Sequence, residues 1–198
     1  MGGDAATLDF YTREAAAYAD HVKDEAGSPQ LARFATMLPP GGDVLDFGCG
    51  PGWAGGWLLE QGFKVQGFDG SEGLAAEARA RYGLDVTVGS FEEFSADGAY
   101  DGIWASFCLL HDSRAAMPRH LERLADALRP GGTLYVGLKE GEGEERDDLG
   151  RHYTYFTESE MRGLLAEAGF SRLEVETEPS VGFSGVPCTS LHMFARRA

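Results

Sequence analysis

The order of apolar and polar residues along the chain predicts strands and helices in alternation. Short runs rich in apolar residues, closed by glycine, proline or polar residues, are typical of strands buried in a sheet. Residues 43–48, DVLDFG, show this pattern clearly, because the run leads directly into glycines. The segments that we expect to be strands are residues 43–48, 63–69, 84–89, 100–107 and 133–139, followed by two near 171–178 and 189–196.

Longer segments between the expected strands carry apolar residues at helical spacing. In residues 7–20, Leu8, Tyr11, Ala15 and Tyr18 recur every three or four positions, which predicts one amphipathic helix. The segments that we expect to be helices are residues 7–20, 29–38, 53–62, 71–83, 114–128 and 157–170.

Residues at the ends of two segments support these boundaries. Ser71 is suited to cap a helix start, because its hydroxyl can accept a hydrogen bond from a free backbone N–H. Gly83 is suited to end the same helix, since glycine readily adopts the left-handed backbone found there. Thr157 and Glu160 have the spacing of a capping box.

The alternation of strands and helices predicts one α/β domain built on a mostly parallel sheet. The glycine-rich, acidic residues 140–150 and the Pro-, Gly- and Ser-containing residues 178–187 are expected to be loops. No repeat or long linker divides the chain. In sheets of this kind, ligands bind at the carboxyl ends of the strands, where the strand order reverses.

The charge balance favours small or neutral partners. The 198 residues include 17 Lys and Arg against 32 Asp and Glu, a formal net charge of −15. Such a surface repels the phosphate backbone of nucleic acids and anionic membrane surfaces, so we expect no nucleic-acid partner. Solubility alone would also explain the charge.

The cysteines and the first residues of the chain are those expected of a protein in a reducing compartment. Cys49, Cys108 and Cys188 are odd in number and lack CxxC spacing, which disfavours a disulfide framework or a zinc site. The residues 1–18 lack a basic start and an apolar core, so no secretory signal is expected. No run of about 18 apolar residues predicts a membrane span. We therefore expect a cytoplasmic protein with no bound metal.

The segment from Val44 to Gly52 carries the most specific chemical signal. An apolar run enters a turn with three alternating glycines, and Gly48 and Gly50 permit a ligand to lie against the main chain. Asp69 lies 17 residues after Gly52, at the end of the next expected strand. An acid at that position can accept two hydrogen bonds from a ribose diol, so the turn and the acid predict an adenosine-binding half-site.

The glycine spacing discriminates between two classes of cofactor. Dinucleotide enzymes use GxGxxG, whose third glycine allows close helix packing and pyrophosphate binding. Here the third position is Trp53, and the pattern is GxGxG. S-adenosylmethionine has no pyrophosphate, so the spacing favours it over NAD.

DVLDFGCGPGWAG resembles the first motif of class I S-adenosylmethionine-dependent methyltransferases. The resemblance continues through GFDGSEGLAAEARARYG, YDGIWASFCLLH and LRPGGTLYVGLKEG, and covers about residues 40–198. The broad subgroup that the chain resembles is that of the small-molecule methyltransferases related to those of quinone biosynthesis. The resemblance implies a Rossmann-like, doubly wound sheet of seven mostly parallel strands with an antiparallel last strand. Residues 41–198 would form this core of a single domain, and helices in residues 1–40 would cover the cofactor site.

The resemblance also implies positions for the cofactor. The methionine end would lie near Asp46 and the glycine turn, Asp69 would hold the ribose, and the adenine would lie after the third strand. The family often has Asp where this chain has Ser90; Ser90 or Glu92 would then accept from the adenine amino group. The implied cofactor-binding residues are Asp46, Gly48, Cys49, Gly50, Asp69, Gly70, Ser71, Ser90, Phe91, Ala105 and Ser106.

Methyl transfer needs alignment of acceptor, methyl and sulfur, and a base where the acceptor carries a proton. His111 follows the fourth expected strand and is the candidate base; a purely structural loop histidine is the alternative. The candidate acceptor-binding residues, each also explicable by packing, are Tyr11, Tyr18, His152, Tyr153 and Tyr155.

The acidic residues 140–150 are predicted to be a mobile lid that closes over the acceptor. Two other functions stay open: a cofactor-binding module of the same fold without catalysis, and a nicotinamide-dependent oxidoreductase. The acceptor atom, whether O, N, C or S, and the oligomeric state are left open by the sequence.

Overall fold

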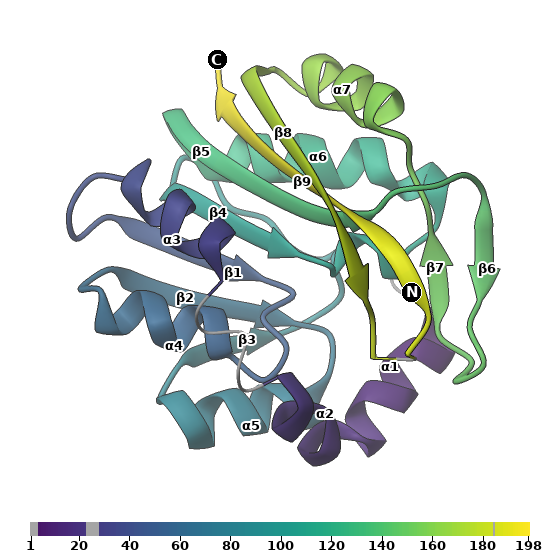
Figure 1. Ribbon diagram of the computed structural model, residues 1–198. Coiled ribbons are helices and arrows are strands. Elements are labelled where there is room, and N and C mark those ends of the chain that lie inside the picture. The colour runs from purple at the N-terminus through teal and green to yellow at the C-terminus, as the bar shows by residue number, and fades with distance from the viewer. Residues whose placement is uncertain (1–3, 23–27, 184) are drawn as a thin grey trace.

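The computed structural model describes residues 4–22, 28–183 and 185–198. One seven-stranded sheet forms its centre, with helices on both faces (Figure 1). The sheet strands are β1 (Asp43–Phe47), β2 (Lys64–Asp69), β3 (Asp85–Val88), β4 (Tyr100–Ser106), β5 (Leu128–Lys139), β8 (Phe170–Val181) and β9 (Pro187–Arg197). The α-helices are α1 (Ala5–Arg13), α2 (Ala15–Val22), α3 (Pro29–Thr36), α4 (Trp53–Glu60), α5 (Glu72–Tyr82), α6 (Met117–Ala127) and α7 (Glu158–Glu167).

The strand order is β3-β2-β1-β4-β5-β9-β8. The first five strands in the chain are parallel to one another, whereas β9 is antiparallel to both β5 and β8. The predicted doubly wound, mostly parallel sheet with an antiparallel last strand is therefore confirmed. The first strand, β1, lies within the sheet. The chain then adds β2 and β3 on one side of β1 and returns to place β4 on its other side. Because the order reverses there, the carboxyl ends of β1 and β4 frame the expected ligand position.

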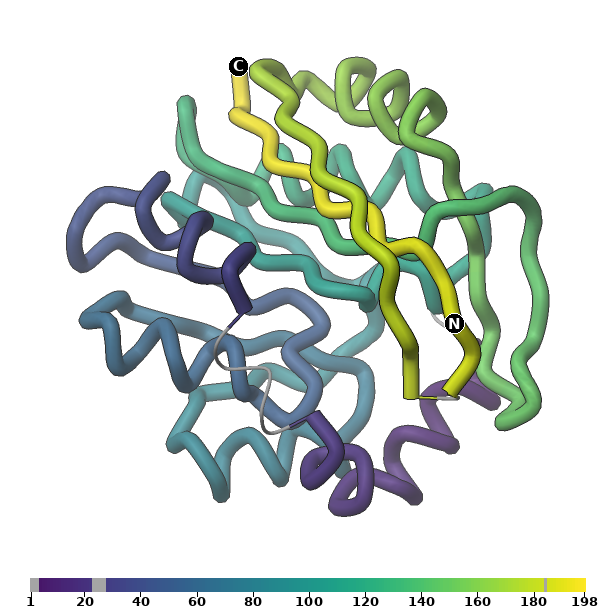
Figure 2. Tube along the Cα trace, viewed as in Figure 1, coloured from purple at the N-terminus to yellow at the C-terminus, as the bar shows by residue number. Residues whose placement is uncertain are grey.

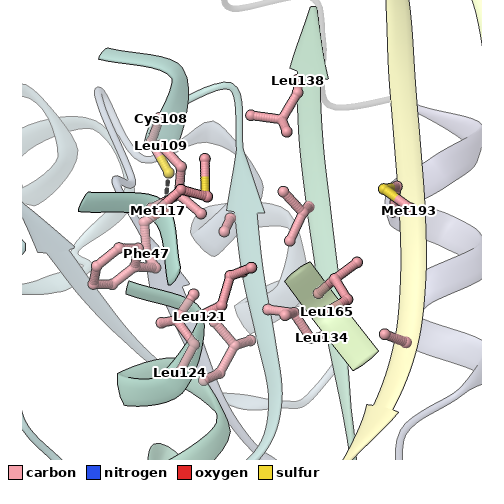
Figure 3. Close-up of a cluster of buried hydrophobic side chains, with 14 of the residues drawn as sticks. Phe47, Cys108, Leu109, Met117, Leu121, Leu124, Leu134, Leu138, Leu165 and Met193 are labelled. Atoms are coloured by element: carbon pink, nitrogen blue, oxygen red, sulfur yellow. Dashed lines mark hydrogen bonds between the residues drawn. The ribbon is translucent and has the colours of Figure 1, made fainter. Parts of the chain in front are cut away.

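Two helical layers bury the two faces of the sheet. Helices α3, α4 and α5 pack on one face, and α6 and α7 pack on the other. On the α6 side, Leu121 and Leu124 lie against Phe47 and Leu134 (Figure 3). The thiol of Cys108 donates a hydrogen bond of 3.0 Å to the carbonyl of Phe47, which ties the segment after β4 to the end of β1.

The predicted helix caps are confirmed. Ser71 accepts a hydrogen bond from the Leu74 N–H at the start of α5, and Gly83 ends that helix at φ +65°. At the start of α7, Thr157 and Glu160 form a reciprocal capping box. The Ser71 and Gly83 caps fix the two ends of α5. The start of α5 in turn fixes the path of the chain after β2.

The expected single helix in residues 7–20 is two helices. The chain leaves helical torsions at Glu14 (φ −97°, ψ 15°), so α1 and α2 meet at a bend. Apolar periodicity continues across the bend, which is why the sequence pattern did not reveal it. Both helices pack on α5. Residues 114–128 likewise begin with a 3-10 turn, η3 (Arg114–Ala116), before α6.

The prediction that residues 140–150 form a loop is wrong in part. Strand β6 (Glu144–Arg146) pairs antiparallel with β7 (His152–Thr154). Two ion pairs stabilise the hairpin. Arg146 of β6 binds Asp4, which is distant in sequence, and Arg151 binds Asp147 within the turn of the hairpin. The strands β8 and β9 also extend into the expected loop at residues 178–187. In Figure 2 the adjoining ends of β8 and β9 approach α1, and Phe183, after β8, packs on Phe10 and Tyr18.

Candidate functional site

The glycine turn after β1 forms one wall of the site. Gly48 and Gly50 have positive φ angles of +67° and +53°. The carbonyl of Phe68 accepts hydrogen bonds from the backbone N–H groups of Gly48 and Cys49, at 2.7 and 3.1 Å. The turn is thus attached to the neighbouring strand β2, with its open side toward the switch point.

Asp69 ends β2 and holds the same turn. One carboxylate oxygen accepts from the Gly50 N–H at 2.8 Å, and the other accepts from the Ser71 N–H at 2.8 Å. The side chain is buried, and burial raises its pKa. Each carboxylate oxygen has a further lone pair, so Asp69 can accept from a ribose diol while it keeps the turn in place.

Asp46 lies behind the turn as a second buried acid. Its carboxylate accepts a hydrogen bond of 2.9 Å from the Gly55 N–H at the start of α4. Burial raises the pKa of Asp46 to about 7, and the charge of Asp69 acts in the same direction. A positively charged group placed beside these two acids would be stabilised electrostatically.

Two cavities meet at the glycine turn. The smaller holds about 90 Å³ and the larger about 500 Å³. Their shared wall is made by Tyr11, Tyr18, Gly48, Gly50, Ser106, Phe107 and His111. The smaller cavity is also lined by Asp69, Gly70, Ser71, Ser90 and Phe91, and the larger by Asp46, Cys49 and Tyr153.

Three of the predicted positions differ from this arrangement. Ala105 is fully buried in the core and lines neither cavity. The His152 ring contacts Thr154 and Glu144, and the Tyr155 hydroxyl donates to Glu145, so both side chains lie on the hairpin away from the cavities. The sequence could not separate them from Tyr153, because the pairing of β6 with β7 decides which side chain faces inward.

The residues expected beside the adenine have other partners in the structure. Ser90 donates from its hydroxyl and its backbone N–H to Glu93. Glu92, the expected substitute acceptor, is exposed. Phe91 packs on Phe47, with ring centroids 4.6 Å apart, and lines the smaller cavity.

His111 lies in the shared wall and is held at both ring nitrogens. Its Nδ1 lies 2.7 Å from the carbonyl of His152, which can only accept, so Nδ1 carries the proton. Nε2 then accepts from the Tyr11 hydroxyl at 2.9 Å. Burial lowers the pKa of His111 to about 4, with the nearby cations Arg151 and Lys139 acting in the same direction. The imidazole is therefore neutral near pH 7.

Several residues of the larger cavity were not predicted. Several of them lie on β5, β8 and β9, and on β5 the side-chain alternation of Tyr135, Gly137 and Lys139 was the available signal. The additional polar and aromatic lining residues include Trp104, Tyr135, Lys139, Arg151, Glu178, Phe183 and His192. Arg151 is almost fully buried, bound to Asp147, and donates to the Tyr11 hydroxyl at 3.0 Å.

Within the described ranges, no group of three or more His, Cys, Asp or Glu side chains is arranged to hold a metal ion. No helix in those ranges is both long and apolar enough to cross a membrane.

Comparison with known proteins agrees with the geometry of the turn. Residues 44–132 match the family described as methyltransferase domain. Over 98% of its length, the chain superposes on 88% of a Burkholderia thailandensis 1,6-didemethyltoxoflavin-N1-methyltransferase, with a TM-score of 0.79 and 27% identity. That crystal structure contains 1,6-didemethyltoxoflavin and S-adenosylhomocysteine. Within residues 44–132 the chain thus matches a methyltransferase domain, and its fold is similar to that of this S-adenosylhomocysteine-binding methyltransferase.

Two curated relatives share the domain. A demethylmenaquinone methyltransferase of Beutenbergia cavernae is 34% identical over 116 residues, 56% of this chain and 48% of that protein. A trans-aconitate 2-methyltransferase of Sinorhizobium fredii is 34% identical over 129 residues, 61% of this chain and 48% of that protein. The chain thus spans about half the length of the curated relatives it matches.

The methyltransferase-domain match ends before the outer part of the larger cavity. It includes the glycine turn, Asp69 and His111, but it stops at residue 132. Lys139, Arg151 and His192 lie beyond it. The family match therefore includes the glycine-turn half of the site, and the strands after residue 132 supply further lining of the larger cavity.

Proposed function

We propose that this chain transfers the methyl group of S-adenosylmethionine to a small-molecule acceptor in the larger cavity. The observation that carries the proposal is the meeting of the two cavities at the glycine turn. Adenosine would occupy the smaller cavity, with its ribose on Asp69. The methionine end would reach the larger cavity beside Asp46, whose carboxylate suits the cofactor's ammonium group.

The size and lining of the larger cavity support a compact, planar acceptor. Its volume of about 500 Å³ has to hold the methionine end as well. Aromatic rings line it, including Trp104, Tyr135, Phe107 and Tyr153. Flat aromatic faces bind planar groups through stacked or edge contacts. The related toxoflavin-precursor enzyme binds a planar heterocycle, which agrees with such an acceptor.

The reaction follows from placing the acceptor against the sulfonium. The acceptor atom attacks the methyl carbon, the S–CH₃ bond breaks, and S-adenosylhomocysteine leaves with the sulfur electron pair. An O–H or N–H acceptor also loses its proton. Alignment by the walls of a closed site is the chief contribution of the protein, because the cofactor already activates the methyl group.

In this proposal His111 holds neighbouring elements in position and does not deprotonate the methyl acceptor. Its Nε2 is occupied by the Tyr11 hydroxyl, and its pKa of about 4 makes it a weak proton acceptor. The His111–Tyr11 contact instead holds α1 over the junction of the two cavities. We therefore propose this positioning role for His111 in place of the role of general base predicted from the sequence.

Titration calorimetry tests the cofactor part of the proposal. We expect S-adenosylhomocysteine to bind and NAD not to bind. Asp69→Ala should weaken binding more than tenfold, because hydrogen bonds to a charged group contribute roughly 1.5–3 kcal/mol each. Asp85→Ala, an exposed acid at the other end of the sheet, is the matched control. Tighter binding of NAD, or equal binding by the Asp69 variant, would contradict the proposal.

Mass spectrometry tests catalysis. The protein is incubated with S-adenosylmethionine carrying a ¹³C-methyl group and a panel of planar phenols, enols and N-heterocycles. We expect one labelled product class and matching S-adenosylhomocysteine. A chain that binds the cofactor but turns over none of the panel would be a binding module of this fold.

A further inference from the structure

One wall of the larger cavity carries polar side chains from β5, β8 and β9. The strand register places Lys139 of β5 opposite Ser190 of β9, and Ser190 opposite Glu178 of β8. Side chains of directly opposed residues lie on the same face of a sheet. The polar wall consists of Lys139, Glu178, Ser180, Ser190 and His192, all of which line the cavity. A molecule in the cavity therefore meets charged and hydroxyl-bearing side chains on this side.

Two charged side chains that line the cavity, Arg151 and Glu178, have partners within the chain. Arg151 binds the carboxylate of Asp147 at 2.6 Å. Glu178 lies 3.1 Å from Nε2 of His192, and this nitrogen donates to it because a carboxylate only accepts. The positive charge of Arg151 is therefore balanced inside the protein, and the carboxylate of Glu178 is turned toward His192.

Lys139 differs from these two side chains in its surroundings. Its ammonium lies 4.1 Å from the centre of the Tyr153 ring, and a side-chain carbon at Gly182 would come within 3.2 Å of Nζ. No carboxylate within the described residues forms an ion pair with it. The side chain is half-buried, and burial lowers its pKa, with the charge of Arg151 acting in the same direction. An anionic group beside Lys139 would therefore be stabilised.

The position of Lys139 in the sheet separates it from the glycine turn. The turn follows β1, and β4 lies between β1 and β5. Neighbouring strands are about 4.8 Å apart, so β5 lies roughly 10 Å from β1. The Lys139 ammonium lies over Tyr153 of β7, whereas the cofactor's methionine end would lie beside Asp46. The space between these two positions is the space that an acceptor would occupy.

We propose that Lys139 determines acceptor specificity by pairing with an oxyanion of the acceptor, either a carboxylate or an ionised phenol or enol. This inference rests on the proposed function and deepens it, because it names the class of acceptor. The acceptor would bind as a planar anion, with its charged oxygen beside the Lys139 ammonium and its flat face against the aromatic lining. Neutral planar molecules of the same shape would bind more weakly.

An ionised acceptor also agrees with the state of His111. The Nε2 atom of His111 is occupied by the Tyr11 hydroxyl, and an acceptor that binds without its proton needs no base there. A phenolate or enolate attacks the methyl carbon, and the S–CH₃ bond breaks with its electron pair left on sulfur. The negative charge of the acceptor and the positive charge of the sulfonium cancel, so no proton has to be removed.

Ligand-observed NMR titrations of the S-adenosylhomocysteine-bound protein compare planar probes that differ in charge. Benzoate is compared with benzamide, and 4-nitrophenolate with 4-nitroaniline, at a pH at which both acids are ionised. We expect an anionic probe to bind about tenfold tighter than its neutral partner. A preference for benzoate alone assigns a carboxylate to the acceptor, and a preference for 4-nitrophenolate alone assigns an ionised phenol or enol.

Substitutions of Lys139 test whether its charge causes the preference. Lys139→Met keeps a long side chain without the charge, so it should remove the tenfold preference and leave the neutral probes bound as before. Lys139→Gln serves the same purpose if the methionine variant is unstable, and Lys139→Arg should keep the preference. Lys64→Met is the matched control, because Lys64 is an exposed lysine at the start of β2, paired with Asp43. It should bind the probes as the wild type does.

Calorimetry with S-adenosylhomocysteine, on the same samples, separates this inference from the proposed function. Lys139→Met should bind S-adenosylhomocysteine as tightly as the wild type does. A tenfold loss would assign Lys139 to the cofactor's carboxylate and overturn the inference. Equal binding of charged and neutral probes, no binding of either anion, or a preference that persists in Lys139→Met would overturn it as well. A wild-type protein that does not bind S-adenosylhomocysteine would instead contradict the proposed function, and the inference with it.

Discussion

The hydroxyl of Tyr11 lies 2.9 Å from Nε2 of His111, and this contact joins residues 100 positions apart. It connects helix α1 to the segment that follows β4, across the junction of the two cavities. Arg151 donates to the same hydroxyl from the β6–β7 hairpin. Three separate elements are therefore fixed to one another through a single phenolic oxygen.

A double-mutant cycle on Tyr11 and His111 tests this connection. Tyr11→Phe leaves a ring nitrogen and a guanidinium N–H without their partner, which costs about 1–3 kcal/mol of unfolding free energy. His111→Gln should cost a similar amount. Because the two side chains share one hydrogen bond, the double variant should lose less than the sum, by roughly 0.5–3 kcal/mol. Urea unfolding measures all four states, and strictly additive losses would show that the contact is not formed in solution.

Asp46 should make stability fall as the pH rises from about 4 to about 7. Its pKa is about 7 in the folded chain, against an ordinary value of 3.8. Between these values the unfolded chain has released the proton and the folded chain still binds it, so raising the pH favours unfolding. Asp46→Asn keeps an acceptor for the Gly55 N–H and cannot ionise.

The Asp46→Asn variant should thus lose less stability than the wild type across that pH window, by a few kcal/mol at most. Unfolding free energies of the unliganded proteins at pH 5, 6, 7 and 8 give the comparison. Above pH 8 the difference should be constant, because Asp46 is then ionised in both states. If the curves of unfolding free energy against pH were parallel for the two proteins, the raised pKa of the buried Asp46 would be contradicted.

Gly48 and Gly50 should respond differently to alanine, although both have positive φ angles. A side-chain carbon at Gly48 would come within 2.2 Å of the Cys108 Cβ, whereas one at Gly50 has no atom within 4 Å. Gly48→Ala therefore adds a steric clash of about 1–3 kcal/mol to the backbone strain. Gly50→Ala carries only the strain of about 1–2 kcal/mol.

The two glycine variants should also separate stability from binding. Gly50→Ala should stay folded but lose most of its affinity for S-adenosylhomocysteine, because the added methyl group occupies the cavity lined by this residue. Thermal unfolding and calorimetry of the same samples give both values. Equal stability of the two variants would mean that the segment after β4 moves away from the turn.

Phe183, at the tip of the β8–β9 hairpin, should slow the release of the bound cofactor. Its ring packs edge-on against Phe10, Tyr18 and His21, on the helices over the cavities. Aromatic pairs contribute about 0.5–1.5 kcal/mol each. Phe183→Ala should therefore raise the dissociation rate constant of S-adenosylhomocysteine about tenfold in stopped-flow measurements. Val186→Ala, at an exposed residue of the same hairpin, should leave the rate unchanged.

Features set by short stretches of sequence were predictable. The glycine turn, the Ser71 cap and the Thr157–Glu160 capping box each depend on residues a few positions apart, and the structure forms all three. The sheet and its antiparallel last strand also followed from the order of segments and the resemblance to a family. These signals located the turn and Asp69 at the edge where the two cavities meet.

Features set by distant partners were not predictable. The pairing of Arg146 with Asp4 crosses 142 residues, and it helps to make a hairpin from a segment that reads as a loop. The Tyr135–His192 contact crosses 57 residues and needs the register of β5 against β9. The side chains of His152 and Tyr153 are neighbours in sequence, but only the folded hairpin shows which one lines the cavity.

The insertion of β9 between β5 and β8 makes the two halves of the site separable in protein engineering. The glycine turn, Asp69 and Asp46 come from residues before β4, whereas Glu178 and His192 come from the two final strands. An exchange of the β8–β9 hairpin with that of another methyltransferase would replace part of the lining of the larger cavity and leave the proposed adenosine half intact. Such chimeras offer a direct route to altered acceptor choice, because natural divergence and laboratory selection can act on one end of the chain alone.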